Sequence, residues 1–461
     1  MYEKQLKSSI QYGSFCNMKK LLGYIIIFAV LSGCKNEQAA KNGISDEEFL
    51  DAMEEAHLGY MWKGAAPNSG MAPERIHMDG IYPQNDADVV AVGGSGFGIA
   101  GLVAGMERGF ISRERGTERL RKIVDFLQTA DTFHGAFPHW LVDGTGRVKP
   151  FSQKDNGGDI VETAFLMEGL LCARQYLDDE NVFERELSSD IDELWKNVEW
   201  DWYQNGTTDK LFWHWSPDYG WQMNVPIEGY NECLIAYVLG ASSPTHPINP
   251  EIYHRCWARG GDIVSHKEQY GLPLVLCYNG AEDYTGPLFW SHYSYIGLCP
   301  KNLKDEYADY WQLVTDHAMI HYNYCVQNPL GHYGYGANCW GLTASYSLDG
   351  YCAHAPYIND PGVITPTASL SSFPYTPKES MAAMKHFYYD MNDLIWGEYG
   401  FYDAFCQEKD WCLKRYLAID QCTITPMIEN YRSGLLWRLF MSCPEVQSGL
   451  TKLGFTFDKN N

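Results

Sequence analysis

Helical periodicity is the feature of this chain that most limits its fold. Apolar residues recur at three-to-four spacing in residues 166–176, 234–239, 381–391 and 431–441, as on the buried face of a helix. Ser112 is placed to cap a further amphipathic helix. Strand-like alternation is scarce, and the connections, such as 212–226 and 331–377, are rich in Gly, Pro, Trp and Tyr. The sequence therefore predicts an all-α domain with long, aromatic-rich loops.

The N-terminus has the form of a targeting signal. Two lysines after Met18 precede an apolar run over 21–31, and the run ends at Leu31-Ser32-Gly33-Cys34. This pattern resembles a bacterial lipoprotein signal in which Cys34 carries the lipid, and Met18 is then the expected true start. The run is too short for a mature membrane span, although an uncleaved anchor is the alternative.

These features predict three parts: a signal region at 1–34, a polar tether at 35–46 and one large domain at 47–461. A lipid on Cys34 would place the protein in the bacterial cell envelope, facing the periplasm or the cell surface. We expect the membrane to be contacted through that lipid only, and the protein to be a monomer.

Charge restricts the partners. The formal net charge is −23, which disfavours nucleic acid, because nucleic-acid affinity rests on neutralising phosphates. Anionic sugars and anionic lipid surfaces are disfavoured for the same reason, so a neutral substrate is expected.

Cysteine and glycine motifs carry no cofactor signal. None of the 14 cysteines forms a CxxC pair or a zinc-ligand cluster with histidine, and most read as small core residues. A GxGxxG pattern begins at Gly96, but the second strand ending in an acid that a dinucleotide site needs is missing. We expect no metal or organic cofactor, and close packing of a glycine-rich segment instead.

Carboxylates stand at three expected helix starts. Asp155, Asp159 and Glu162 would share one narrow face if the segment were helical, at about 0°, 40° and −20°. Gly157 and Gly158 favour a helix that begins between the first and the second acid. Helix capping explains one acid but not three. We therefore expect at least one of them in an active site.

Two further acids follow the same logic. Glu232 precedes an apolar helical run, where burial would raise its pKa and suit it to general acid catalysis, whereas Glu228 reads as a capping residue. Asp420 is a candidate to hold or deprotonate a water. Glu429 and Arg432, expected to open the last long helix, read best as a structural ion pair.

Aromatic residues make up 15% of the chain, and many lie in polar loops. Flat aromatic faces suit the apolar faces of sugar rings. Sugar stacking and core packing are equally good interpretations of four tryptophans in such loops: Trp213, Trp215, Trp221 and Trp340.

Several of these segments together resemble one family over about residues 60–443. They are Gly229-Tyr-Asn-Glu232 with Ser243-Pro-Thr-His246-Pro, Ala418-Ile-Asp-Gln421 with Ile428-Glu-Asn-Tyr-Arg432, Phe97-Gly98 with Glu107-Arg108-Gly109, and the Asp159/Glu162 segment. The combination resembles the bacterial glycoamylase-like domain family. The resemblance implies an (α/α)6 toroid, a six-hairpin barrel, and a family in which some members are endo-β-1,2-glucanases.

The resemblance also implies roles. Glu232 becomes the candidate general acid and Asp420 the base-side carboxylate, with Asp155, Asp159 and Glu162 lining the same cleft. Candidate substrate-binding residues are Tyr230, Asn231, Trp215, His246, Trp340, Glu429 and Arg432. Gln421-Cys-Thr departs from the smaller, more apolar run expected there, which affects subsite detail.

The sequence thus favours a lipid-anchored glycoside hydrolase that acts on a neutral glucan, most simply β-1,2-linked, with inversion. An exo-acting glucoamylase-type enzyme or another carbohydrate-active enzyme on the same fold is the first alternative. A lyase would need a basic cleft and a phosphorylase a basic phosphate cluster, and neither is visible. A surface glycan-binding lipoprotein without catalysis is the second alternative.

Overall fold

The structure is a computed structural model that describes residues 43–280 and 282–459, so Cys34 and the predicted signal lie outside the described residues. The described residues divide into two units, with the boundary after Phe49. In the first unit, Ser45 and Glu48 form a reciprocal capping box at the start of α2, with the Ser45 N–H donating to Glu48 Oε2 at 2.8 Å.

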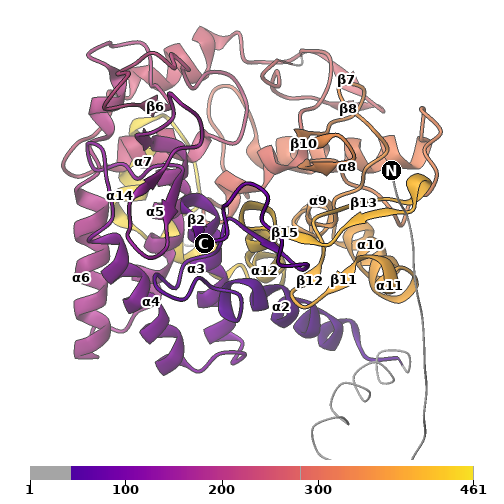
Figure 1. The fold of residues 1–461 in the computed structure, drawn as a ribbon. Helices are drawn as coiled ribbons and strands as arrows, with labels where there is room; N and C mark the ends of the chain where they lie inside the picture. Colours follow the sequence, from indigo (N-terminus) through magenta and orange to yellow (C-terminus); the bar gives the residue numbers. More distant parts are fainter. Residues whose placement is uncertain (1–42, 281, 460–461) are drawn as a thin grey trace, which may run out of the picture. The chain divides into compact units, whose positions relative to one another are not determined.

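Helices dominate the second unit (Figure 1). The α-helices are α2 (Asp46–Trp62), α3 (Val92–Glu107), α4 (Arg113–Leu127), α5 (Ile160–Tyr176), α6 (Val182–Lys196), α7 (Leu234–Ser242), α8 (Tyr310–Gln327), α9 (Pro366–Leu370), α10 (Pro377–Asp390), α11 (Asn392–Ile395), α12 (Ala418–Arg432), α13 (Leu435–Met441) and α14 (Pro444–Lys452). Short helical turns are η1 (Trp200–Gln204), η2 (Tyr253–Trp257), η3 (Arg259–Gly261), η4 (Leu288–Ser291), η5 (Tyr293–Tyr295) and η6 (Gln407–Lys409).

Buried and amphipathic helices alternate along the chain. Almost every residue of α3, α5 and α7 is buried, whereas α4 and α6 bury one face. A helix that is apolar all round needs neighbours on all sides, and an amphipathic one covers the outside. Figure 1 shows α4 and α6 outside α3 and α5. The described part of the chain is thus helix-rich, with an inner and an outer helix layer.

Glycine explains the tightest helix contact in the inner layer. A Cβ added to Gly96 on α3 would lie 2.1 Å from the Phe165 carbonyl oxygen on α5, and one added to Gly169 would lie 1.9 Å from the Gly96 carbonyl oxygen. The two helices therefore touch backbone to backbone. The GxGxxG segment is a packing surface, which confirms that prediction.

The strands are short and lie in the connections. They are β1 (Arg75–His77), β2 (Val89–Ala91), β3 (Trp140–Val142), β4 (Val148–Lys149), β5 (Gly158–Asp159), β6 (His214–Trp215), β7 (Glu268–Gln269), β8 (Leu272–Pro273), β9 (Ala344–Ser347), β10 (Gly350–Ala353), β11 (Trp396–Gly397), β12 (Gly400–Phe401), β13 (Ala404–Cys406), β14 (Trp411–Leu413) and β15 (Arg415–Leu417). All pair antiparallel, as β2–β3–β4 and as pairs such as β5–β6 and β1–β15. They refine the all-α prediction, since the long loops are held by small sheets.

The structure bears out one predicted helix start and corrects one predicted helix. The α5 helix begins at Ile160 with Asp159 as its N-cap, so Asp155 lies in the preceding loop, as the two glycines between the acids predict, and not on a helical face. Residues 431–441 do not form one helix, because Gly434 adopts a left-handed φ of 70° that ends α12 before α13 begins. Ser112 caps α4 as predicted, accepting from the Arg115 N–H.

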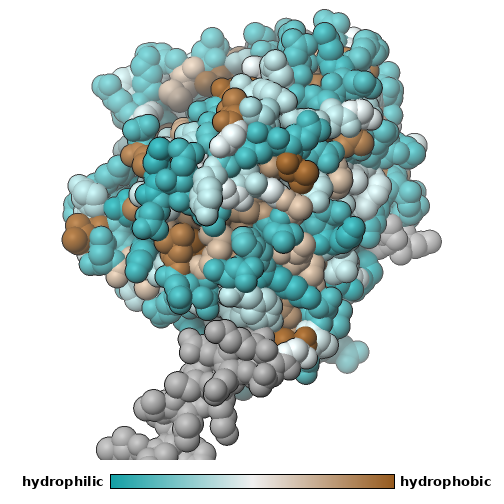
Figure 2. Space-filling model, turned by 90° about the vertical axis from the view of Figure 1, so that its right-hand side faces the viewer, coloured by the Kyte–Doolittle hydropathy of each residue, from teal (hydrophilic) through white to brown (hydrophobic). Residues whose placement is uncertain are grey.

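The cysteines, the length of the helices and the surface complete the description of this part of the chain. The twelve cysteines in this part carry free thiols, including Cys406 and Cys412. None of the helices between residues 43 and 459 is both long and apolar enough to cross a bilayer. The face in Figure 2 is largely hydrophilic, with apolar residues in small groups.

Candidate active site

Four buried segments begin at one cleft. The residues Ala91, Glu162, Glu232 and Ile419, which line it, lie at or near the N-terminal ends of α3, α5, α7 and α12. Helix N-termini carry partial positive charge, which favours carboxylates there. The cleft has a volume of about 450 Å³. Its other lining residues include Glu74, Arg75, His139, Trp140, Phe151, Phe165, Trp213, Phe289, Tyr293, Tyr346 and Tyr351.

Asp159 anchors the first group of acids. Its Oδ1 accepts the backbone N–H groups of Val161 at 3.0 Å and Glu162 at 2.9 Å, while Oδ2 lies 3.0 Å from His139 Nδ1. Burial would raise the pKa of Asp159, but the hydrogen bond from His139, the positive charges of His214 and His139 and the backbone N–H lower it. Asp159 therefore stays ionised as a fixed anchor for His139.

Glu162 is the member of this group that reaches the cleft. Its Oε2 accepts the Gly93 N–H at 2.8 Å, and Oε1 lies 3.7 Å from His139 Nε2. Burial raises the pKa of Glu162 to about 7 against the lowering effect of His139. Glu162 can thus exchange a proton near neutral pH.

Asp155 joins the same cluster through a histidine. Its Oδ2 lies 3.5 Å from His214 Nε2, on β6, which pairs with β5. Burial and the charge of Asp159 raise the pKa of Asp155 to about 7. The three predicted acids are therefore together, but a strand pair and two histidines assemble them.

His139 is the cation of the cluster. Burial would lower the pKa of His139, but Glu162, Asp159 and Asp155 raise it to about 10. The donor atoms of His139, Asp155 and Asp159 lie within 4.8 Å of one another, close enough for a metal ion. A protonated imidazole has no free lone pair for a metal, so the cluster is better suited to holding protons.

Glu232 lies in the turn before α7 and is partly exposed in the cleft wall. The Ser294 hydroxyl donates to its backbone carbonyl and fixes the turn. Desolvation raises the pKa of Glu232 to about 7, and the charge of Asp159 adds to the effect. A carboxyl group that is protonated near neutral pH and reaches the cleft is suited to donate a proton.

Asp420 forms a buried pair with Asp403. The oxygens Asp403 Oδ1 and Asp420 Oδ2 have no hydrogen-bond donor from any other described residue, and a proton shared between the two carboxyl groups joins them as a hydrogen-bonded pair. Burial and Asp403 raise the pKa of Asp420 well above its ordinary range, whereas the pKa of Asp403 rises to about 6, chiefly by burial. The pair therefore holds one proton and one negative charge near pH 7.

Tyr293 connects this pair with the cleft. It lines the cleft, and its hydroxyl donates to Asp420 Oδ1 at 3.3 Å. Burial raises the pKa of Tyr293 well above its ordinary range, with Asp420, Glu232 and Glu162 among the charges that add to it. Its hydroxyl thus lies near the acids of all three predicted segments.

Several predicted substrate-binding residues do not lie in the cleft. Tyr230 is fully buried, and its hydroxyl contacts Ser291 Oγ at 3.1 Å. Asn231 is buried and accepts the Cys233 N–H at 2.9 Å. Trp340 is also fully buried. These side chains stabilise the loops around Glu232 and α10, so the predicted sugar contacts for them are corrected.

Glu429 and Arg432 make structural contacts away from the cleft. Glu429 Oε2 accepts Arg108 Nε at 2.6 Å, and Arg432 Nη1 lies 3.1 Å from Glu54 Oε2 on α2. Both sit at the C-terminal end of α12, whereas Asp420 is in its first turn. They hold α12 against α2 and α3, far along the helix from the cleft.

Trp215 and His246 lie outside the cleft lining as well. Trp215 is on β6 beside His214, with its ring 5.9 Å from that of Trp202. His246 lines a separate cavity with Trp202 and Trp221.

Sequence reasoning missed four groups of the site: His139, His214, Tyr293 and Asp403. All four are flanked by aromatics, in Phe137-Pro-His-Trp140, Trp213-His-Trp215, Phe289-Trp-Ser-His-Tyr-Ser-Tyr295 and Phe401-Tyr-Asp-Ala-Phe405. Aromatic neighbours are common in this chain, which has 32 tyrosines, so the signal does not single out Tyr293.

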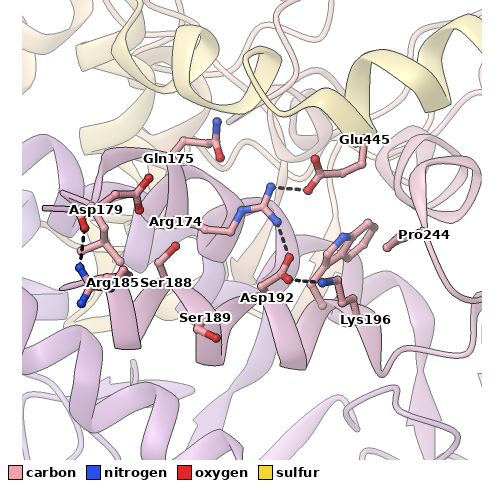
Figure 3. Close-up of a pocket in the computed structure, with 12 residues that line it drawn as sticks. Arg174, Gln175, Asp179, Arg185, Ser188, Ser189, Asp192, Lys196, Pro244 and Glu445 are labelled. Carbon is pink, nitrogen blue, oxygen red and sulfur yellow. Dashed lines mark hydrogen bonds and ion pairs between the residues drawn. The ribbon is translucent and has the colours of Figure 1, made fainter. Parts of the chain in front are cut away.

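A larger groove of about 620 Å³ lies elsewhere, between α5, α6 and α14 (Figure 3). Figure 3 shows Arg174 between Asp192, at 2.9 Å, and Glu445. Lys196 pairs with Asp192, and Arg185 donates to the Asp179 carbonyl oxygen at 2.9 Å. The charged side chains of this groove bond to one another, so we interpret the groove as a contact between helices that ion pairs stabilise.

Comparison with known proteins identifies the family. Residues 224–444 match the Glycoamylase family model, described as "Putative glucoamylase". An endo-β-1,2-glucanase from Chitinophaga pinensis, solved with sophorotriose and glucose, is 58% identical, with a TM-score of 0.89 over 90% of this chain and 99% of that one. The chain belongs to the glycoamylase-like family. This confirms the resemblance drawn from the sequence.

Two further relatives extend the comparison. An exo-β-1,2-glucooligosaccharide sophorohydrolase from Parabacteroides distasonis is 44% identical over 433 residues, 89% of this chain. The glycoamylase-like chain described here spans 58% of that relative's length. An endo-β-1,2-glucanase from Talaromyces funiculosus, solved with sophorose, has a TM-score of 0.63 at 12% identity over 87% of each chain, which shows a shared fold.

Proposed function

We propose that this protein is a glycoside hydrolase that cleaves β-1,2-linked glucan in the interior of the chain. One observation carries the proposal: Glu232, whose pKa is raised to about 7, lines the same cleft as Glu162 and Tyr293. The Tyr293 hydroxyl donates a hydrogen bond to Asp420 and so connects that acid with the cleft. Glycoside hydrolases use a pair of carboxyl groups that flank the glycosidic bond to be cleaved. The β-1,2 linkage is taken from the names of the relatives from C. pinensis and P. distasonis.

In the proposed reaction, Glu232 donates its proton to the glycosidic oxygen as the bond to the anomeric carbon breaks. Water adds its oxygen to the anomeric carbon from the opposite face. Its proton passes to the singly charged Asp403/Asp420 pair, with the Tyr293 hydroxyl between the pair and the cleft. The pair then releases its extra proton to solvent, and solvent returns a proton to Glu232. This route inverts the anomeric centre and needs the two carboxyl groups about 6.5–9.5 Å apart.

Glu162 supplies negative charge at the wall of the cleft in this scheme, with Asp155 and Asp159 behind it and His139 as their counter-cation. A glycosyl cation develops positive charge in the transition state, and a fixed carboxylate beside it stabilises that charge. Phe151 and Tyr351 line the cleft, and each is 52% exposed. An open cleft entrance lets a glucan chain pass through, which supports cleavage in the interior of the chain. The relative from P. distasonis differs in this respect, since its name describes an exo-acting enzyme.

The proposed hydrolysis is tested with protein that begins after Cys34 and a panel of neutral glucans, with products resolved by size. Oligosaccharides of several lengths from β-1,2-glucan alone are the expected result. Release of sophorose alone would favour an exo-acting enzyme, and glucose from α-glucans a glucoamylase-type enzyme. Binding of a glycan with no product would favour the non-catalytic alternative.

Two structural proposals accompany the activity. We propose that the inner and outer helices close into an (α/α)6 toroid, supported by the alternation of buried and amphipathic helices. We also propose that the chain is a monomer held in the cell envelope by a lipid on Cys34. Replacing Cys34 with alanine is expected to move the protein from the membrane to the soluble fraction of cells, and retention in the membrane would contradict the anchor.

A further inference from the structure

Trp202 keeps more than a third of its surface in contact with solvent, at 37% exposed. It belongs to η1, in which Trp200 and Tyr203 turn inward and are buried. A large aromatic side chain that stays partly exposed gives up stabilisation that its two buried neighbours in the same turn gain, so a binding role is the first interpretation.

Trp202 opens onto a cavity of about 590 Å³, here called the Trp202 cavity. Trp221 forms a second aromatic wall, with ring centroids 6.4 Å apart and planes inclined by 33°. The rest of its lining is polar: Glu199, Asp201, Asn205, Gly206 and His246. Lysine and arginine are absent from this lining as far as the described residues go, so the cavity is poorly suited to an anion.

The Trp202 ring is held in place before any ligand arrives. It stacks on His134 with centroids 3.5 Å apart and planes 12° apart. Glu199 Oε2 lies 3.0 Å from His134 Nδ1, and Trp215 packs edge-on against both rings, at 4.9 Å from His134 and 5.9 Å from Trp202. A fixed ring loses little conformational entropy when a ligand stacks on it.

The Trp202 cavity also connects with the cleft through β6. His214 lies 3.5 Å from Asp155 in the acid cluster, and the next residue, Trp215, contacts Trp202. One short strand therefore contacts both the catalytic cluster and the exposed aromatic platform. A polymer bound at the cleft is the ligand that this continuity favours.

We propose that the Trp202 cavity is a second binding site for a neutral glucan, separate from the cleft. The sugar rings stack on Trp202 and Trp221, and their hydroxyls bond to Glu199, Asp201 and His246. The identity of the glucan rests on the proposed β-1,2-glucanase function. The site holds long chains and contributes nothing to short ones that fill the cleft alone.

The test compares Trp202→Ala and Trp202→Phe with unaltered protein. Retention by β-1,2-glucan polymer in native gels reports binding, and kcat/KM is measured on the polymer and on oligosaccharides of three or four units. Trp202→Ala is expected to weaken polymer retention and kcat/KM on the polymer by about three- to tenfold, with the phenylalanine variant between. Tyr333→Ala, which removes a ring that is 71% exposed outside this lining, is the matched control.

The outcomes separate the two proposals. Equal losses on polymer and on short substrates would mean that the change acts through Trp215 on the cleft, and unchanged polymer binding would mean that no second site exists; either overturns the inference. Trp202-dependent retention without hydrolysis by the unaltered protein would keep the second site and remove the proposed activity.

Discussion

The role assigned to Glu232 leads to a quantitative prediction. Its pKa rises from an ordinary 4.5 to about 7, chiefly because the turn before α7 desolvates it. At pH 7 a carboxyl with a pKa of 4.5 is protonated in roughly 0.3% of molecules, and one with a pKa near 7 in about half, a gain of roughly 150-fold. The site thus supplies an acid at neutral pH that an exposed glutamate could not.

Replacing Glu232 with glutamine removes that proton but keeps the shape of the side chain. The expected loss in kcat is about 10²–10⁴-fold, or about 3–5 kcal/mol of transition-state stabilisation. In unaltered protein, activity should fall about tenfold per pH unit above pH 7 as Glu232 ionises, and the residual activity of the variant should lack that decline.

The assay is the release of reducing ends from β-1,2-glucan between pH 4 and 9. Glu228→Gln is the matched control, since Glu228 lies four residues earlier and outside the cleft lining. A Glu232→Gln variant within threefold of the unaltered rate, or one that keeps the alkaline decline, would refute the assignment of the acid.

Three further predictions follow from single contacts. Gly93→Ala would place a Cβ 2.5 Å from the Glu162 carboxylate and should lower kcat on β-1,2-glucan at least tenfold. Gly101→Ala, on the same helix, is the control, because its Cβ would lie 3.7 Å from its nearest neighbour, Leu58; this variant should keep activity and gain about 0.5–1 kcal/mol of stability in urea unfolding. Tyr293→Phe removes the hydroxyl that lowers the pKa of Asp420. The Asp403/Asp420 pair should then take up its second proton at higher pH, so the acid limb of the pH–rate profile should move to higher pH. An acid limb that does not move would exclude this pair as the base. His139→Gln should cost about 3 kcal/mol of unfolding free energy. Because the pKa of His139 rises from 6.5 to about 10, the difference from unaltered protein should be full below pH 6.5 and shrink as pH rises through 10; a difference that grows with pH would contradict this.

The sequence predicts well what depends on local pattern. Ser112 caps α4, the glycines around Gly96 allow close helix packing, and Asp159 and Glu162 stand at a helix start, each readable from neighbours in the chain. The family resemblance is of the same kind, because it rests on short motifs, and the comparisons confirm it.

What the sequence does not reveal depends on tertiary contacts. His139 becomes the partner of Asp159 only because the segment at Phe137 is hydrogen-bonded to the start of α5. Trp340 is buried while Trp202 is partly exposed, although both lie in aromatic-rich segments. The strand pair β5–β6, not a helical face, brings Asp155 to the cluster. Periodicity reports which residues share a face of one element, and it carries no information on which elements meet.

Proton NMR of β-1,2-glucan during hydrolysis tests the central claim most directly, because it follows bond cleavage and the configuration of each new reducing end together. The account predicts new reducing ends that appear first as the α-anomer, the product of direct attack by water on a β-linkage. New ends that appear first as the β-anomer would contradict the roles given to Glu232 and the Asp403/Asp420 pair, and the absence of new ends would contradict the proposed hydrolysis itself.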